Sequence, residues 1–325
     1  KENKKIKGVI LTDSISRKEY RVHAAIVINA TGVFVDSVLA MDDSNKPALV
    51  SPSQGVHIVL DKKFFPGNEA MMIPKTTDGR VLFAVPWHNK VVVGTTDTPI
   101  EKISLEPVAL DTEINFILNN INAYLNVAVG RADVLSVFAG LRPLVKIKSE
   151  NNTSIMPRDH TIVMSDSGLI SITGGKWTTY RKMAKDVIDK AANAGGFIKK
   201  DCVTHQLKIH GWVNEVNQND PLHFYGADLE ALKNLTKENE AWAAYLHPAF
   251  PYTKSCVVWA VRNEMAMTVE DVLARRTRML FLDARAAIDS APIVANLMAD
   301  EMMKDQHWVI DQTDSFITLA KRYIL

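Results

Sequence analysis

The sequence predicts a mixed α/β protein that ends in an all-helical region, and three observations predict this class. Continuous apolar runs at 25–29 and 169–173 are typical of strands that are buried on both faces. Between these runs, several stretches alternate with a two-residue period, as half-buried strands do. After about residue 196 the strand signals stop, and apolar residues recur at helical spacing. We therefore expect one domain over residues 1–200 and a helical domain over residues 201–325.

The first domain is expected to begin with a hairpin whose strands are joined by a polar turn. A buried strand, a short helix, an antiparallel sheet and a strand–turn–helix unit follow, and one apolar stripe at 111–125 predicts a helix within the sheet region. The strands are expected at 4–12, 19–23, 25–29, 53–60, 70–73, 80–87, 90–95, 133–144, 161–164 and 169–173, and the short helix at 33–41. The helices of the second domain are expected at 229–235, 255–265, 269–274, 283–303 and 305–323.

The strand–turn–helix unit at 169–195 is the most informative stretch. Its strand runs into Gly174-Gly175, Lys176 follows, and a helix opens at Trp177. A helix N-terminus presents unpaired N–H groups and the positive end of a dipole, and glycines let a ligand approach the backbone. Lys176 adds a full positive charge. The pattern fits a site for an anion or an electron-rich ring edge, and it fits an ordinary strand-to-helix turn equally well.

The composition narrows the classes of protein. The chain has 325 residues, of which 47% are hydrophobic and 23% charged, as in a soluble protein with a large core. A net charge of +1 gives no reason to expect nucleic acid as a partner. The two cysteines, Cys202 and Cys256, are too few for a disulfide scaffold and suit a reducing compartment. Because no apolar run approaches the ~20 residues of a spanning helix, we expect any membrane contact to be peripheral.

Three polar side chains in the expected sheet region are candidates for chemistry. Arg142 precedes a proline, which favours an extended backbone. Its guanidinium can hold a phosphate through two parallel hydrogen bonds, although a lone arginine is commonly part of a surface ion pair. His57 is either a satisfied core histidine or an active-site residue, and Asp97 either orients a cation or caps a turn. No metal site is predicted, because His205 and His210 have no carboxylate or cysteine at ligand spacing.

Six motifs follow one another along the chain. They are INATG at 28–32, SQGVHIVL at 53–60, VVVGTTD at 91–97, FAGLRPL at 138–144, PRDH at 157–160 and GGKWTTYR at 174–181. In order and spacing they resemble the FAD-dependent, quinone-linked glycerol-3-phosphate dehydrogenases. The stretch 245–278 is similar to the helical domain that ends those enzymes, so the resemblance covers nearly the whole chain. It implies an FAD-linked oxidoreductase fold with part of a nucleotide-binding domain, an antiparallel substrate-domain sheet at about 50–145 and an all-α C-terminal domain.

One feature of that family is missing. The family begins with a strand, a GxGxxG turn and a helix that hold the FAD pyrophosphate. No GxGxxG occurs in this sequence. We therefore expect a C-terminal portion of a longer enzyme, which alone neither binds FAD tightly nor is active. If Lys1 were the true start, a non-catalytic anion-binding module would be the alternative.

The resemblance also implies roles for individual residues. Arg142 and Arg158 match arginines that contact substrate, and His57 matches the histidine of the substrate domain. Histidine is a candidate general base because an unperturbed imidazole titrates near neutral pH. These three residues are the expected catalytic group. The expected FAD contacts are Ala30, Thr31, Gly32, Gly174, Gly175, Lys176, Thr178 and Thr179, with the N–H groups of Gly175 and Lys176 at the flavin N1/O2 edge.

The implied activity is oxidation of sn-glycerol 3-phosphate to dihydroxyacetone phosphate, with FAD as cofactor and a quinone as electron acceptor. Oxygen replaces the quinone in the oxidase branch of the family. The implied location is the cytoplasm, with peripheral attachment to the inner membrane, and homodimerisation stays open. Another flavin-dependent oxidase of the superfamily, acting on an amine or amino acid, is the close alternative, although the paired arginines favour a phosphate.

Overall fold

The long strands β4 (Val50–Asp61) and β9 (Val134–Val145) each run through two compact units of the protein. The structure is a computed structural model that describes residues 1–146 and 159–325. The first unit contains Lys1–Gly55, Asp97–Pro107 and Gly140–Leu207, and the second contains Val56–Thr96, Val108–Ala139 and Lys208–Leu325. The boundary expected near residue 200 lies close to the last passage of the chain from the first unit to the second, between Leu207 and Lys208.

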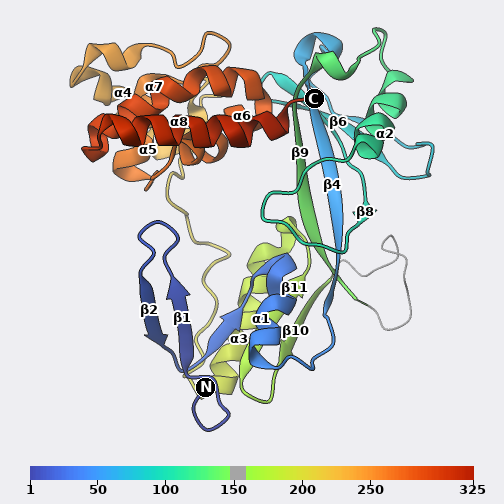
Figure 1. Ribbon diagram of the computed structural model, residues 1–325, viewed down its shortest axis with the longest axis vertical. Helices are drawn as coiled ribbons and strands as arrows, with labels where there is room; N and C mark the ends of the chain where they lie inside the picture. Colours follow the sequence, from blue (N-terminus) through green and yellow to red (C-terminus); the bar gives the residue numbers. More distant parts are fainter. Residues whose placement is uncertain (147–158) are drawn as a thin grey trace. The chain divides into compact units, whose positions relative to one another are not determined.

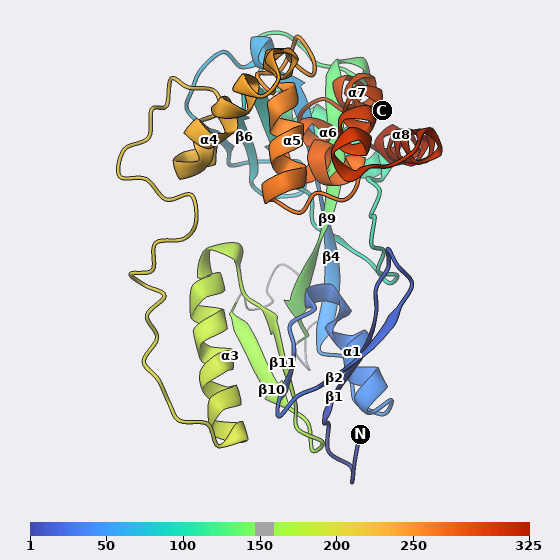
Figure 2. The same cartoon turned by 90° about the vertical axis from the view of Figure 1, so that its left-hand side faces the viewer.

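The first unit is built on a three-stranded sheet in the order β10-β11-β3. β10 (His160–Met164) pairs antiparallel with β11 (Leu169–Gly174), and β11 pairs parallel with β3 (Val27–Asn29). The helices α1 (Val35–Asp42) and α3 (Tyr180–Gly195) lie on opposite sides of this sheet (Figure 2).

Side-chain alternation along β11 explains the two helical layers. Leu169 points into a cluster with Val35 and Leu39 of α1, whereas Ile170 and Ile172 point into a cluster with Val187 and Ala191 of α3. Because successive strand residues face opposite sides of a sheet, one apolar strand supplies the core of both layers. The apolar run that predicted this strand is therefore the centre of the unit.

A carboxylate ties the end of α1 to the turn between β10 and β11. The Ser167 hydroxyl donates to Asp42 Oδ1 at 2.6 Å, and the Lys1 ammonium lies 2.6 Å from the same oxygen. Burial raises the pKa of Asp42, but the hydrogen bonds from Lys1, Ser167 and Ser165 outweigh it and lower the pKa to about 2. The ionised carboxylate thus stabilises the first unit at neutral pH.

The same unit includes the hairpin of β1 (Gly8–Thr12) and β2 (Glu19–His23), which are antiparallel with Gly8 opposite His23. The hairpin was predicted at this place. Each residue of the two strands after Gly8 is exposed to solvent, including Ile10, Leu11 and Tyr20.

Among the described residues, a six-stranded sheet occupies the middle of the sequence and has the order β5-β6-β7-β4-β8, with β9 also paired to β4 (Figure 1). The neighbours along β5-β6-β7-β4-β8 are antiparallel. In the second unit, α2 (Asp111–Asn122) packs its stripe of Ile114, Ile117 and Ile121 against Val56 and Ile58 of β4. The shorter strands are β5 (Met71–Ile73), β6 (Leu82–Trp87), β7 (Lys90–Gly94) and β8 (Thr98–Pro99).

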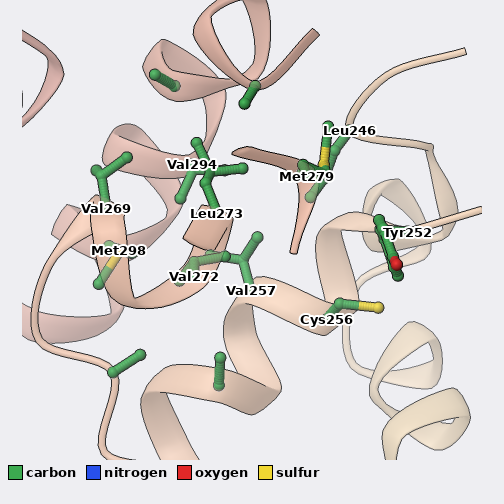
Figure 3. Close-up of a cluster of buried hydrophobic side chains, with 14 of the residues drawn as sticks. Leu246, Tyr252, Cys256, Val257, Val269, Val272, Leu273, Met279, Val294 and Met298 are labelled. Carbon is green, nitrogen blue, oxygen red and sulfur yellow. The ribbon is translucent and has the colours of Figure 1, made fainter. Parts of the chain in front are cut away.

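From residue 222 onward the described elements are helical. The α-helices are α4 (Leu229–Asn234), α5 (Lys254–Asn263), α6 (Met279–Leu282), α7 (Ala284–Met302) and α8 (Gln306–Ala320), with a π-helix at Asp271–Arg276 (η9). Short 3-10 helices lie at His223–Asp228 (η6), Leu235–Lys237 (η7), Glu240–Ala243 (η8) and Lys321–Tyr323 (η10). Figure 3 shows Val257 of α5, Leu273 of η9 and Val294 of α7 pointing into one core, where all three are fully buried.

Contacts between the antiparallel sheet and the helices explain why the two share a unit. Trp87 of β6 packs against the helical core. The Ser136 hydroxyl of β9 donates to the carbonyl of Leu280 in α6 at 2.8 Å, and the Arg285 guanidinium of α7 donates to the carbonyl of Val134 at 3.2 Å. The sequence prediction grouped this sheet with residues 1–200. The difference arises because such long-range contacts leave no periodic signal in the sequence.

Candidate active site

The glycine turn after β11 has the geometry that the sequence predicts. Gly174 and Gly175 have φ of +78° and +75°, in the left-handed region that favours glycine. A Cβ on Gly174 would lie 2.7 Å from the carbonyl oxygen of Asp159, and one on Gly175 would lie 2.5 Å from the sulfur of Met183. A 3-10 turn (η5, Trp177–Thr179) then leads directly into α3. Only glycine fits this turn without strain.

Two N–H groups of the turn donate hydrogen bonds to nearby oxygen atoms of the protein. The Gly175 N–H donates to the Asp159 carbonyl at 3.2 Å, and the Lys176 N–H donates to Thr179 Oγ1 at 3.2 Å. The Thr179 hydroxyl itself donates to the Lys176 carbonyl at 2.9 Å. Both N–H groups therefore have hydrogen-bond partners within the protein, and the Thr179 side chain caps the start of the helix. Their contact with the flavin edge stays a prediction. The Lys176 ammonium is exposed and has no carboxylate partner in 1–146 or 159–325.

The second predicted cofactor motif meets the first at one edge of the sheet. β3 ends at Asn29, opposite Ser171, and the strands are parallel, so Ala30–Gly32 and Gly174–Lys176 leave the sheet at the same edge. The Asn29 amide donates to Ser171 Oγ at 3.2 Å and joins the two strand ends. Ligands of open α/β sheets bind at this carboxyl edge.

The residues at this edge fit FAD. Ala30, Thr31, Lys176 and Thr178 are exposed there. The hydroxyl of Thr173 is buried next to the glycine turn and has no hydrogen-bond partner among the described residues. A buried hydroxyl without a partner costs stability unless a ligand satisfies it. A positive side chain and an unsatisfied hydroxyl beside the glycine turn together suit the electron-rich edge of an isoalloxazine ring.

Arg142, the first predicted substrate arginine, lies in the space that a side chain at Gly55 would occupy. A Cβ on Gly55 would lie 2.3 Å from Nη2 of Arg142, so the guanidinium covers Gly55. Nη1 of Arg142 lies 3.6 Å from Oδ1 of Asp97, and the Ser53 hydroxyl donates to the same oxygen. Of the two roles considered for Asp97, the structure shows the ion pair, which orients a cation. Gly55 was not singled out from the sequence, although a glycine inside a strand often marks a close approach.

His57 belongs to the second unit, where its ring is in contact with a backbone segment and with an aromatic side chain. It is paired with Gly94 across β4 and β7, and a Cβ on Gly94 would lie 2.2 Å from Cδ2 of the imidazole. The Phe138 ring stacks on the imidazole at a centroid distance of 5.3 Å and an interplanar angle of 18°. His57 is half-buried. The histidine is therefore neither a fully buried core residue nor a free surface side chain.

Arg158, the second predicted substrate arginine, lies outside the described residues. The described chain resumes at Asp159, and His160 then opens β10 beside the glycine turn. His160 Nε2 lies 3.0 Å from Oδ2 of Asp186, which also accepts hydrogen bonds from Lys182. The Lys182 bonds, together with the weaker effect of His160, hold the pKa of Asp186 below its usual value. The sequence analysis assigned no role to this pair, which supports the turn from the side of α3.

Two kinds of feature are absent from the described residues. Residues 1–146 and 159–325 contain no group of three or more histidine, cysteine or acidic side chains arranged to hold a metal ion. In that same part of the chain, no helix combines the length and apolar character needed to cross a bilayer.

Known protein families match this chain. The family described as FAD dependent oxidoreductase matches residues 1–181. The chain belongs to the FAD-dependent oxidoreductase family. The C-terminal domain of alpha-glycerophosphate oxidase matches residues 169–308. The resemblance and the fold type predicted from the sequence are confirmed by these matches.

Individual relatives agree with the family assignment. The probable mitochondrial glycerol-3-phosphate dehydrogenase of Caenorhabditis elegans is 36% identical over 98% of this chain and 48% of its own length. The mitochondrial glycerol-3-phosphate dehydrogenase of Homo sapiens is 35% identical over 96% of this chain and 46% of its own length. This chain thus spans about half the length of these relatives.

A solved structure matches the fold. The X-ray structure of the glycerol-3-phosphate dehydrogenase from Bacillus halodurans, complexed with FAD, has a TM-score of 0.84 to this chain at 28% identity. The match covers 99% of this chain and 67% of that one.

Proposed function

We propose that this chain carries the substrate-binding part of an FAD-dependent enzyme that oxidises sn-glycerol 3-phosphate to dihydroxyacetone phosphate. The main support is the parallel pairing of β3 with β11, which brings Ala30–Gly32 and Gly174–Lys176 to one edge of a sheet. The names of the relatives and the match to an FAD-bound dehydrogenase support the same reaction.

The reaction removes a hydride from C2 of the substrate and a proton from its C2 hydroxyl. FAD, when bound, supplies the hydride acceptor. Arg142 is the proposed anchor of the substrate phosphate or of the developing charge at O2, because Asp97 holds its guanidinium in one orientation. His57 is the proposed base that takes the hydroxyl proton, and Arg158 is the proposed second anchor. Lys176 is proposed to face the flavin edge where negative charge develops.

The two electrons are proposed to pass to a quinone. A quinone is dissolved in the bilayer, so the proposal includes peripheral attachment to the cytoplasmic face of the inner membrane and leaves homodimerisation open. Oxygen is the second candidate acceptor, because residues 169–308 match the C-terminal domain of an alpha-glycerophosphate oxidase.

The test uses the protein encoded by the complete natural reading frame. We expect it to reduce a soluble quinone analogue with sn-glycerol 3-phosphate and not with glycine or sarcosine, and a measurement of hydrogen peroxide separates the oxidase from the quinone-linked enzyme. Arg142→Lys should not rescue Arg142→Ala, because lysine cannot make a bidentate contact. Loss of a charge-assisted, partly buried contact should lower kcat/KM, by an amount that corresponds to about 2–5 kcal/mol of lost transition-state stabilisation. A near-normal kcat/KM in Arg142→Ala would remove this residue from the site, and equal turnover of glycine would remove the substrate assignment.

A further inference from the structure

A row of aromatic side chains connects His57 to the C-terminal helices within the second unit. The imidazole stacks on Phe138 of β9 at a centroid distance of 5.3 Å. Phe138 meets the ring of Phe281 in α6 edge-on at 5.2 Å and 83°, and Phe281 meets Tyr323 of η10 edge-on at 5.7 Å and 76°. Stacked and edge-to-face pairs at these distances are attractive beyond the area that they bury. The row therefore joins a candidate active-site ring to the end of the chain.

The far end of this row is fixed in place. Phe281 and Tyr323 pack against the helical core, and the residues flanking Phe281, Leu280 and Leu282, are fully buried. α6 and β9 are also hydrogen-bonded, because the buried Ser136 hydroxyl donates to the Leu280 carbonyl at 2.8 Å. The Phe138 ring is thus supported on one side by Phe281, which packs against the helical core.

A second side of the His57 ring lies against backbone. Gly94 lies across the sheet from His57, and its missing Cβ leaves the space that the imidazole occupies. The imidazole therefore has Phe138 against one face and the β7 backbone against its Cδ2 edge. Such contacts restrict a side chain to one rotamer, which a base needs if its nitrogen is to meet one particular proton.

We propose that Phe138 is a positioning residue for His57, and that Phe281 transmits the packing of the C-terminal helices to it. The helical region would then set the geometry of the proton transfer and not only stabilise the fold. This inference rests on the proposed function, in which His57 is the base.

The experiment is a double-mutant cycle on the protein of the complete reading frame, loaded with FAD. Phe138→Leu removes the stacked ring and keeps an apolar side chain, and Phe138→Tyr is the conservative variant that keeps the ring. Phe250→Leu is the matched control, because Phe250 is a buried ring of the same unit that stacks on Tyr252 at 5.9 Å. Each rate constant is normalised to the amount of bound FAD. Each variant is measured with normal substrate and with substrate deuterated at C2, which gives the primary isotope effect.

We expect Phe138→Leu to lower kcat about ten- to a hundredfold, as a misplacement of about 1 Å does, with a nearly unchanged KM. The primary isotope effect on kcat should rise, because the chemical step becomes slower relative to product release. Phe138→Tyr should restore most of kcat. Phe281→Leu removes the ring that contacts Phe138, and it should lower kcat by a smaller factor. Phe250→Leu should leave kcat and the isotope effect unchanged.

The cycle separates this inference from the function on which it rests. If Phe138 acts through His57, Phe138→Leu should have no further effect on kcat in a His57→Gln background. Additive losses, or an equal loss in Phe250→Leu, would overturn the positioning role while His57 keeps its own. Unchanged kcat in His57→Gln alone would instead overturn the proposed base. If Phe138→Leu does not fold, Phe281→Leu in the same cycle decides the question.

Discussion

The closest approach between a glycine and a charged side chain in the candidate site gives a prediction that can be worked out from distances. A Cβ at Gly55 would lie 2.3 Å from Nη2 and 2.6 Å from Cζ of Arg142, whereas ordinary contacts begin near 3.4 Å. In Gly55→Ala the guanidinium must therefore withdraw by about 1 Å, and its 3.6 Å contact with Asp97 changes. The substitution moves the charge and does not remove it.

The two consequences of this displacement differ in size. Misplacement of a substrate-holding group by about 1 Å costs on the order of a hundredfold in rate, which corresponds to about 2.7 kcal/mol. The effect on the free energy of unfolding should be small, because a partly exposed ion pair contributes only about 0.2–1 kcal/mol. The lower backbone entropy of alanine in the unfolded chain offsets a similar amount, about 0.4–1 kcal/mol.

The assay measures kcat/KM for sn-glycerol 3-phosphate beside the thermal unfolding midpoint in Gly55→Ala. Gly67→Ala is the control, because the nearest atom to a Cβ there is a glutamate oxygen at 3.8 Å. We expect kcat/KM of Gly55→Ala to fall about a hundredfold while the midpoint stays within a few degrees of the parent. A change in kcat/KM of less than twofold in a folded Gly55→Ala protein would refute the reasoning, and so would an equal loss in Gly67→Ala.

Two further predictions concern the first unit. Because the pKa of Asp42 is lowered to about 2, its ionised form contributes stability above pH 4 that disappears as the pH falls through 2. Asp42→Asn should lower the free energy of unfolding by at most about 2 kcal/mol at pH 7. Urea unfolding at several pH values measures this, and a deficit that persists unchanged below pH 2 contradicts it. Lys176→Met should lower the flavin midpoint potential by about 30 mV for each ~1.4 kcal/mol of lost preference for the reduced form. Arg142→Met should lower it less, and an unchanged potential in Lys176→Met with FAD bound would show that the lysine points away from the ring.

The glycine turn shows how much a sequence pattern can predict. A continuous apolar run, two glycines and a helical stripe are local signals, so β11, the turn and α3 occur where the sequence places them. The hydrogen bonds of the turn were not predictable in the same way. Whether the Lys176 N–H faces outward depends on the Thr179 rotamer, and the hydroxyl turns back to cap the helix start. Residue type alone does not decide between these two arrangements.

The neighbours of His57 could not be predicted from the sequence, because they depend on a strand register that no local pattern contains. The two-residue period places His57 on one face of β4, but the glycine beside it comes from β7 and the ring against it from β9. The fold class was predictable because periodicity sets it, whereas the grouping of the antiparallel sheet with the helices depends on contacts such as Ser136 to Leu280. Arg158 stays a prediction, because it lies outside the described residues.

Glycines place the functional side chains of both units by the same physical means. Gly55 leaves room for a guanidinium, Gly94 for an imidazole and Gly175 for the Met183 side chain under the turn. A glycine in a strand interior costs roughly 0.5–1 kcal/mol relative to alanine, because it loses more backbone entropy on folding. At Gly55 and Gly94 the strand loses this stability, and in return a polar side chain lies close against the backbone and has fewer rotamers to choose from. If catalysis depends on those orientations, substitutions at these glycines should reduce activity more than they reduce stability.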